Sequence, residues 1–232
     1  MPTMERISSA VLEDGLRLRL VGAGEAPRPE LFLSAGELDK AASFRAEKRR
    51  REWTGGRYAA KALIREALAP GASLRDIGID YDTMGRPVWR DRVRTHLISI
   101  THSGPFCAAA CAGPSAVFLG IDIEKAEPRA EAWYKDYFTR GELDREPGTL
   151  EPAVLATRLW TQKEALLKAL GLGLKADPLD IDLSGENPVF LRMAAARYAE
   201  LGKPRFRLRT LECGPDHSLS LAWQILEGND GF

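Results

Sequence analysis

The sequence predicts an α+β protein made of two similar halves. Two observations indicate this fold class: the chain repeats at a nearly constant spacing, and each half alternates between helical and strand-like patterns. Residues 15–19 (GLRLR) align with residues 120–124 (GIDIE), and residues 34–39 (SAGELD) align with residues 139–144 (TRGELD), both at an offset of 105. We therefore expect an internal duplication, with the halves packed about a pseudo-two-fold axis around a shared cleft.

The repeat continues into the second part of each half. At an offset of 107, Trp53 aligns with Trp160, and residues 61–63 (KAL) align with residues 168–170. Further on, residues 79–80 (ID) align with residues 181–182. No single match is strong, so the duplication is inferred from their order and spacing.

Each half is predicted to contain a strand, a capped helix and then a long helix. Ser34 with Glu37, and Thr139 with Glu142, form capping boxes, in which a hydroxyl and a carboxylate three residues apart satisfy backbone N–H groups at a helix start. The long helices are expected over residues 45–69 and 152–170. Two adjacent glycines, at 55 and 56, cost roughly 1 kcal/mol each in helix propensity and indicate a close approach or a break.

Strands are expected after each long helix. They are predicted at residues 77–81, 87–89, 97–100 and 106–111 in the first half, and at residues 180–183, 189–191, 205–211 and 219–224 in the second. Gly113-Pro114 gives the predicted junction. The predicted domains are a basic N-terminal half, residues 1–114, and a C-terminal half with an acidic motif, residues 115–232.

The composition is that of an ordinary globular protein that can bury a core. Hydrophobic residues make up 44% of the chain and charged residues 28%. Because the net charge is zero, we expect no global attraction to nucleic acid or membranes. No apolar run is long enough for a membrane span or a signal core. Cys107 and Cys111 lie in an apolar run and are expected to be small buried thiols in a reduced, cytoplasmic protein.

Two short motifs carry the chemistry predicted for the second half. In a strand, side chains alternate between faces, so Asp122 and Glu124 point the same way. In a helix, Glu164 and Lys168 are four residues apart and share one face. Because Mg²⁺ prefers a few carboxylates with water and phosphate oxygens, these residues predict a Mg²⁺ site beside a phosphate. The alternative is an exposed strand face and a helical ion pair worth about 0.3–0.5 kcal/mol.

A comparison of the aligned halves favours the metal site. The residues of the first half that align with Asp122, Glu124 and Glu164 are Arg17, Arg19 and Arg57. The fold does not require negative charge at these positions, because the aligned residues of the first half are positively charged. Acid in one half and base in the other suits a metal–phosphate ligand between them, although the two arginines of residues 15–19 are equally explained by a solvated strand face.

Two segments of the first half are candidates for anion binding. Residues 99–104 (SITHSG) predict a strand that passes into a hydroxyl-rich turn, where hydroxyls, backbone N–H groups and His102 can hold a phosphate. A structural histidine is the alternative. Residues 45–57 form a basic helical segment that fits a nucleic-acid patch or a solvated helix face. The neutral chain argues against the patch, and Arg57 is the candidate for an inward anion contact.

Five segments, in order along the chain, resemble the motifs of the 4′-phosphopantetheinyl transferases, and in particular the long, pseudo-dimeric type similar to the surfactin-synthetase activator. They are residues 56–61 (GRYAAK), 85–87 (GRP), 100–103 (ITHS), 120–125 (GIDIEK) and 160–173 (WTQKEALLKALGLG). The last two are highly specific and the first two are loose. The resemblance implies this family's fold, and transfer of phosphopantetheine from coenzyme A to a serine of an apo acyl or peptidyl carrier protein, with Mg²⁺ as cofactor and 3′,5′-ADP as product.

The resemblance also implies a role for each matching residue. The Mg²⁺ ligands would be Asp122, Glu124 and Glu164; the phosphate contacts would be Lys168 and Lys163; and the other coenzyme A contacts would be Arg57, Gly85, Arg86, Pro87, Thr101, His102 and Ser103. Of these, His102 and Arg57 would meet the ribose 3′-phosphate, and residues 85–87 would line the adenosine pocket. Thr101 stands where the family usually has serine and Arg86 where lysine is common, and both keep the role.

The implied reaction requires that the negative charge of the pyrophosphate is neutralised and that a base accepts the proton of the serine hydroxyl. Mg²⁺ would polarise the pyrophosphate, and Lys168 would stabilise charge on the departing phosphate. Glu142 matches the glutamate that is proposed as the base in this family, and it also occupies a capping position, as Glu37 does in a half without the acidic motif. Glu142 and a metal-bound water stay open as alternatives for the base.

Two other functions compete with the transferase. One is another Mg²⁺-dependent phosphoryl or nucleotidyl transferase, which would turn over nucleotides without a carrier protein. The other is a nucleic-acid-binding module that uses Arg49, Arg50 and Arg51. For the transferase we expect a cytoplasmic protein without nucleic-acid or membrane partners. We expect it to be a monomer, because the second half supplies the partner that a shorter relative would recruit.

Overall fold

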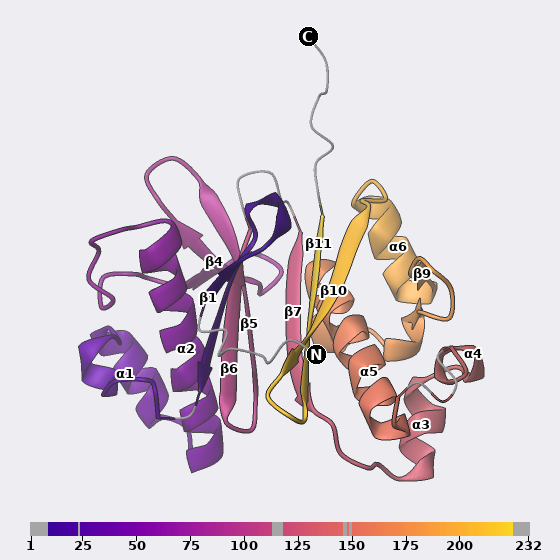
Figure 1. Cartoon of the computed structure of the whole chain (residues 1–232). Helices are drawn as coiled ribbons and strands as arrows, with labels where there is room; N and C mark the ends of the chain where they lie inside the picture. Colours follow the sequence, from indigo (N-terminus) through magenta and orange to yellow (C-terminus); the bar gives the residue numbers. More distant parts are fainter. Residues whose placement is uncertain (1–8, 23, 113–117, 146–147, 149, 225–232) are drawn as a thin grey trace. The chain divides into compact units, whose positions relative to one another are not determined.

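The computed structural model describes residues 9–22, 24–112, 118–145, 148 and 150–224. The chain forms two compact units, Met1–Ala116 and Val117–Phe232. Each combines helices with antiparallel strands, which confirms the predicted α+β class (Figure 1). The predicted junction at Gly113-Pro114 lies outside the described residues, and the pseudo-two-fold relation between the halves stays a prediction.

The N-terminal unit contains a six-stranded antiparallel sheet in the order β1-β2-β6-β5-β4-β3. Its elements are β1 (Ser9–Val11), β2 (Arg17–Gly22), α1 (Ala35–Ala42), α2 (Glu47–Ala67), β3 (Asp80–Tyr81), β4 (Pro87–Arg90), β5 (Thr95–Ser103) and β6 (Phe106–Cys111), with 3-10 turns at Glu13–Gly15 and Pro29–Leu31. Helix α2 packs against β2, β5 and β6 (Figure 1). The core lies between this helix and the sheet.

Two glycines allow α2 to approach the sheet closely. A Cβ on Gly55 would lie 2.6 Å from Cys107 Sγ, and a Cβ on Gly56 would lie 2.8 Å from Ile100 Cγ2. The helix runs without interruption from residue 47 to residue 67. The glycine pair therefore marks a close approach rather than a break.

The C-terminal unit contains a three-stranded antiparallel sheet in the order β10-β11-β7. Its elements are β7 (Leu119–Lys125), α3 (Glu131–Tyr137), α4 (Arg140–Leu143), α5 (Pro152–Ala169), β8 (Ile181–Asp182), β9 (Val189–Phe190), α6 (Arg192–Glu200), β10 (Phe206–Cys213) and β11 (His217–Gln224), with 3-10 turns at Gly173–Lys175 and Pro178–Asp180. Strands β8 and β9 pair separately. Helix α5 packs against β7 and β11 (Figure 1).

Both predicted capping boxes are present. The Ser34 hydroxyl accepts from the Glu37 backbone N–H while the Glu37 carboxylate accepts from the Ser34 N–H. Thr139 and Glu142 make the same two bonds at the start of α4. The short helices α1 and α4 therefore begin for the reason that the sequence indicates.

The contacts correct the predicted alignment of the two long helices. Lys61 in α2 bonds to the capping-box carboxylate of Glu37, and in α5 the lysine that bonds to Glu142 is Lys163. By its contacts Lys61 therefore corresponds to Lys163, at an offset of 102, and not to Lys168 at the predicted offset of 107. The predicted match of Arg57 with Glu164 loses its basis with this correction.

We expect Gly120→Ala to destabilise the C-terminal unit severely. A Cβ at this position would overlap the backbone carbonyl oxygen of Ala165 in α5, and a backbone atom cannot move aside as a side chain can. The expected loss in the free energy of unfolding is about 3 kcal/mol or more. Urea denaturation followed by circular dichroism measures it. The matched control is Gly36→Ala on the surface of α1, where a Cβ meets nothing within 4 Å, and it should be neutral or slightly stabilising.

Candidate active site

Helix α5 and strand β7 bring together a cluster of charged side chains in the C-terminal unit. Asp122 and Glu124 alternate along β7 with buried isoleucines, so they share the face on which Gly120 contacts α5. The Lys168 ammonium in the last turn of α5 donates to Asp122 Oδ1 at 2.7 Å and to the Ile121 carbonyl oxygen at 3.0 Å. Helix and strand are therefore joined by an ion pair at this site.

The acidic side chains of this cluster differ in their exposure. Asp122 is 5% exposed and Glu164 is 6% exposed, whereas the Lys168 side chain is 28% exposed. Glu124 borders a cavity of about 170 Å³, which is also lined by Lys125, Arg129, Trp133, Thr157 and Trp160. One acidic group therefore faces an open cavity, and two lie beneath the surface.

Glu164 has a strongly perturbed pKa. Burial raises the pKa of this carboxyl from 4.5 to about 7; the charge of Asp122 and, more weakly, that of Glu124 raise it too, while Lys168 lowers it. A carboxyl group whose charged form is disfavoured in this way gains from a bound cation. A titratable group perturbed by burial and like charges is also typical of functional sites.

The donor set fits a divalent cation in type. Mg²⁺ takes one or two carboxylates together with water and phosphate oxygens, and Asp122 and Glu164 supply two oxygen-bearing groups with excess negative charge beside them. Within the described ranges, however, no group of three or more His, Cys, Asp or Glu side chains is arranged to hold a metal ion. The predicted trio with Glu124 is therefore not a preformed ligand set.

Lys163 and Glu142 form a separate buried pair. The Lys163 ammonium donates to Glu142 Oε2 at 2.9 Å and to the Tyr137 carbonyl oxygen at 2.9 Å, and both charged side chains are fully buried. Burial lowers the pKa of Lys163, and the hydrogen bond and charge of Glu142 oppose that shift. The structure thus places two of the predicted site residues with each other.

In the N-terminal unit, Arg57 is buried between two aromatic rings. Its guanidinium carbon lies 5.1 Å from the centre of the Trp53 ring and 5.4 Å from that of Tyr81. It donates to the Tyr81 hydroxyl at 2.7 Å and to the Ile79 carbonyl oxygen at 3.4 Å. These contacts join α2 to β3 and leave Arg57 largely covered.

His102 lies at the end of β5, beside the first turns of α2. Its Nε2 is 3.2 Å from Arg49 Nη1, and its Nδ1 is 3.7 Å from Glu52 Oε2. Thr101 is buried, whereas Ser103 is half-buried at the turn into β6. His102 is therefore in contact with an arginine of the basic helical segment.

Residues 85–87 belong to a tight turn that Asp82 organises. The Asp82 carboxylate accepts from the backbone N–H groups of Met84 and Arg86, and from Arg86 Nε at 2.7 Å. Gly85 has a φ of +82°, a conformation that favours glycine. The hydrogen bonds and charge of Arg86 hold the pKa of Asp82 below its ordinary value even though burial opposes this. Pro87 then begins β4.

Sequence reasoning missed three partners of the predicted residues: Arg49 beside His102, Tyr81 beside Arg57, and Asp82 beside Arg86. Only the last had a local signal, since an aspartate that precedes a glycine turn is typical of such loops. The other two contacts join segments that are far apart in the sequence. Periodicity and spacing do not specify them.

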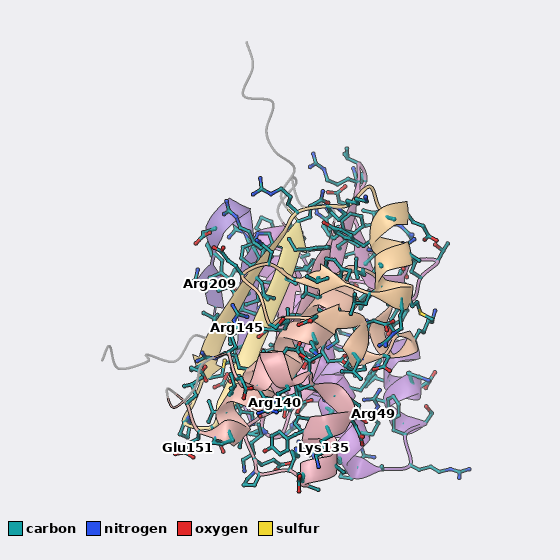
Figure 2. All side chains as sticks on the ribbon, turned by 90° about the vertical axis from the view of Figure 1, so that its right-hand side faces the viewer. Arg49, Lys135, Arg140, Arg145, Glu151 and Arg209 are labelled. Carbon is teal, nitrogen blue, oxygen red and sulfur yellow. The ribbon has the colours of Figure 1, made fainter. Side chains whose placement is uncertain are left out.

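Other charged residues of the C-terminal unit lie on its surface. Figure 2 labels Lys135, Arg140 and Arg145 on the side of this unit that faces the viewer. Lys135 pairs with Glu131, and the Arg140 side chain, which is 95% exposed, pairs with Asp144. Exposed pairs of this kind contribute little to stability. The surface of α4 thus contrasts with its buried Glu142.

Comparisons with known proteins identify the family. The model of the 4′-phosphopantetheinyl transferase superfamily matches residues 118–217, and that of the 4′-phosphopantetheinyl transferase N-terminal domain matches residues 39–112. The 4′-phosphopantetheinyl transferase HetI of Nostoc sp. strain PCC 7120 is 31% identical over 171 residues, which are 71% of this chain and 70% of HetI. The chain belongs to the 4′-phosphopantetheinyl transferase family. The family and enzyme class predicted from the motifs are thereby confirmed.

Two further comparisons cover less of the chain. A holo-[acyl-carrier-protein] synthase of Staphylococcus carnosus is 40% identical over 86 residues, 35% of this chain and 73% of that protein. A crystal structure of the holo-(acyl-carrier-protein) synthase of Bacillus anthracis in complex with coenzyme A (3′,5′-ADP) is 25% identical, with a TM-score of 0.35, and covers 42% of this chain and 93% of that one. The part of the chain that the structure describes contains no helix with the length and apolarity of a membrane span.

We expect Glu164→Gln to stabilise the metal-free protein at alkaline pH. Between about pH 4.5 and pH 7 the unfolded chain ionises Glu164 while the folded chain keeps its proton, so the wild type loses stability as the pH rises. A neutral glutamine avoids this loss, which amounts to about 3 kcal/mol. Urea unfolding at pH 4 and pH 8 in EDTA measures the difference. The free energy of unfolding of Glu164→Gln should exceed that of the wild type at pH 8 and not at pH 4, whereas exposed Glu131→Gln should match the wild type at both. An equal effect of Glu164→Gln at both pH values would contradict a raised pKa of Glu164.

Proposed function

We propose that this chain transfers the 4′-phosphopantetheine group of coenzyme A to a serine of an apo acyl or peptidyl carrier protein, with Mg²⁺ as cofactor. The observation that carries the proposal is the charged cluster between β7 and α5. Asp122, Glu164 and Lys168 come together there, inside the region that matches the superfamily model. The relatives named as carrier-protein synthases support the choice of acceptor.

The reaction is a phosphoryl transfer. The serine Oγ forms a bond to the phosphorus that bears pantetheine, the bond from this phosphorus to the bridging oxygen breaks, and 3′,5′-ADP leaves with the electron pair. Lys168, whose ammonium is held at Asp122, is placed to offset charge on the leaving phosphate. Asp122, Glu164 and the more exposed Glu124 would hold Mg²⁺, which supplies Lewis-acid polarisation of the pyrophosphate oxygens.

The serine proton needs an acceptor. Glu164 would hold the Mg²⁺ in this proposal, and a carboxylate that binds a cation is a weaker base than its metal-free pKa of about 7 indicates. Glu142, the other carboxylate considered for this step, is fully buried and paired with Lys163. Of the two alternatives for the base, we therefore propose a water of the β7–α5 cluster in preference to Glu142.

The N-terminal unit would bind the nucleotide part of coenzyme A. His102 with Arg49 offers an imidazole and a guanidinium to the ribose 3′-phosphate, with Thr101 and Ser103 beside them in the chain. The turn of residues 85–87 would line the adenosine pocket. Because Arg57 is covered by Trp53 and Tyr81, we propose that it supports β3 in front of this turn and that Arg49 meets the phosphate.

The remaining expectations concern the state of the protein in the cell. We propose a cytoplasmic monomer that binds neither nucleic acid nor membranes. The free thiols of Cys107, Cys111 and Cys213 suit a reducing compartment, and burial raises their pKa to about 11, about 12 and about 11. Two units in one chain suit a monomer. Sedimentation of the purified protein tests the oligomeric state.

We expect an apo carrier protein to gain the mass of one phosphopantetheine when it is incubated with coenzyme A, Mg²⁺ and this chain. Intact-mass spectrometry measures the gain, and EDTA should abolish it. Asp122→Asn should lower the rate at least about 100-fold, because an interaction with the reacting pyrophosphate is lost. The matched control, Asp136→Asn on the exposed surface of α3, should keep the wild-type rate.

The outcomes of this experiment separate the candidate functions. No mass gain with fatty-acid, polyketide and peptide carriers, together with nucleotide turnover in their absence, would favour the phosphoryl or nucleotidyl transferase instead. Full activity of Asp122→Asn would contradict the metal assignment and leave the transferase intact.

Mg²⁺ should raise the melting temperature of the wild type at pH 8 and should not raise that of Asp122→Asn or Glu164→Gln. The reason is that a cation bound only by the folded chain stabilises it, by an amount that rises with the logarithm of its concentration once this exceeds the dissociation constant. Differential scanning fluorimetry over a Mg²⁺ series measures the shift without any substrate. Equal shifts in all three proteins would show that the ion binds elsewhere.

A further inference from the structure

Glu142 is enclosed by hydrogen-bond donors in the C-terminal unit. Its Oε2 accepts from the Thr139 backbone N–H at 2.8 Å, from the Thr139 hydroxyl at 3.3 Å and from the Lys163 ammonium at 2.9 Å. Its Oε1 accepts from the Leu183 backbone N–H at 2.8 Å. The residue is fully buried. Both oxygens are therefore engaged by the protein's own groups.

Lys163 completes this arrangement from α5. Its side chain is also fully buried, its ammonium bonds to Glu142 and to the carbonyl oxygen of Tyr137 at the end of α3, and it lies 5.2 Å from the centre of the Phe138 ring. We call the bonded pair the Glu142–Lys163 clamp. It ties α5 to the end of α3, to the start of α4 and to the segment after β8.

The N-terminal unit contains the same arrangement without the acidic motif. There Lys61 of α2 bonds to the capping-box Glu37 and to the carbonyl oxygen of Phe32, which lies two residues before the cap at Ser34. In the C-terminal unit, Tyr137 likewise lies two residues before the cap at Thr139. On β2, arginines stand in place of the acidic residues of β7. A clamp that is present in a unit without the acidic residues does not require them.

We infer that the Glu142–Lys163 clamp is a positioning device for α5, and that neither residue touches the reacting atoms. This inference rests on the proposed transferase function. A base must expose a free carboxylate oxygen to the serine proton, and both oxygens of Glu142 are bonded inside the unit. A phosphate contact must present its ammonium at the surface, and that of Lys163 is bonded beneath it.

The clamp is expected to affect catalysis through Glu164, which follows Lys163 in the sequence, and through Lys168. Lys163 is adjacent to Glu164, and Lys168 lies one further turn along the same helix. Lys163 bonds to the end of α3 and to Glu142 at the start of α4, and Glu142 bonds in turn to the segment after β8. These contacts fix the rotation and the axial position of α5 against β7. The distance from Lys168 to Asp122 depends on that position. Small displacements of groups that position a substrate lower rates strongly, so the clamp should act on kcat.

The test compares two double variants that remove equivalent buried ion pairs, Glu142→Gln with Lys163→Met and Glu37→Gln with Lys61→Met. Replacing both partners avoids leaving one charge buried alone. The C-terminal variant is expected to lower kcat roughly 10- to 100-fold, with KM for coenzyme A within about twofold of the wild type. The N-terminal variant should keep kcat within about twofold, after correction for the folded fraction measured by circular dichroism.

The single variant Glu142→Gln supplies a readout that separates positioning from base catalysis. If the clamp positions α5, the acid limb of the kcat–pH profile stays at its wild-type pH. Loss of that limb together with a fall in kcat would make Glu142 the base and overturn the inference. If loss of Lys163 raises the KM for coenzyme A about tenfold or more, Lys163 is a phosphate contact. This result would also overturn the inference.

Two further results keep the inference testable. If the C-terminal double variant does not fold, the KM is measured on Lys163→Arg instead. This variant keeps a cation beside Glu142. Equal losses of kcat in the two double variants would reduce the clamp to a general contribution to stability. The wild type is assayed in parallel, so an inactive wild type would refute the proposed function, whereas the variants alone decide the role of the clamp.

Discussion

The close contact between α5 and β7 is the constraint on which the candidate active site depends. Gly120 contacts the backbone of α5, and because it lacks a Cβ the helix can lie directly on the strand. At this separation the Lys168 ammonium reaches both Asp122 and the neighbouring carbonyl oxygen. The same proximity removes Glu164 from water and raises its pKa. Packing and acid–base chemistry at this site therefore have one cause.

Two buried carboxyl groups of the C-terminal unit, those of Glu142 and Glu164, have different surroundings. At Glu142 and Lys163 every carboxylate oxygen has a donor, so the cost of burial is offset by hydrogen bonds within the protein. At Glu164 burial opposes ionisation, and the charges of the neighbouring carboxylates oppose it further. The first arrangement is stable without a ligand, and the second gains from a cation. This contrast is the physical reason for giving the two glutamates different roles.

The family comparison and the geometry support each other at different levels. The family models cover both units and identify the enzyme class. The contacts then divide the predicted residues by what they can do. Lys168 stays partly exposed beside Asp122, while Lys163, five residues earlier on the same helix, is enclosed. Motif spacing does not separate the two lysines, because both belong to the same stretch of residues 160–173.

The sequence by itself determined the α+β class, the long helices, both capping boxes and the shared face of Asp122 and Glu124. These follow from local chemistry: the period of a strand or helix, and hydroxyls or carboxylates three residues from a helix start. Only the tertiary structure decided which lysine meets the capping-box glutamate, how deeply Arg57 lies between its aromatic neighbours, and that Arg49 joins His102. Each of these depends on how segments far apart in the chain pack together, and on the desolvation that results, which no spacing along the sequence specifies.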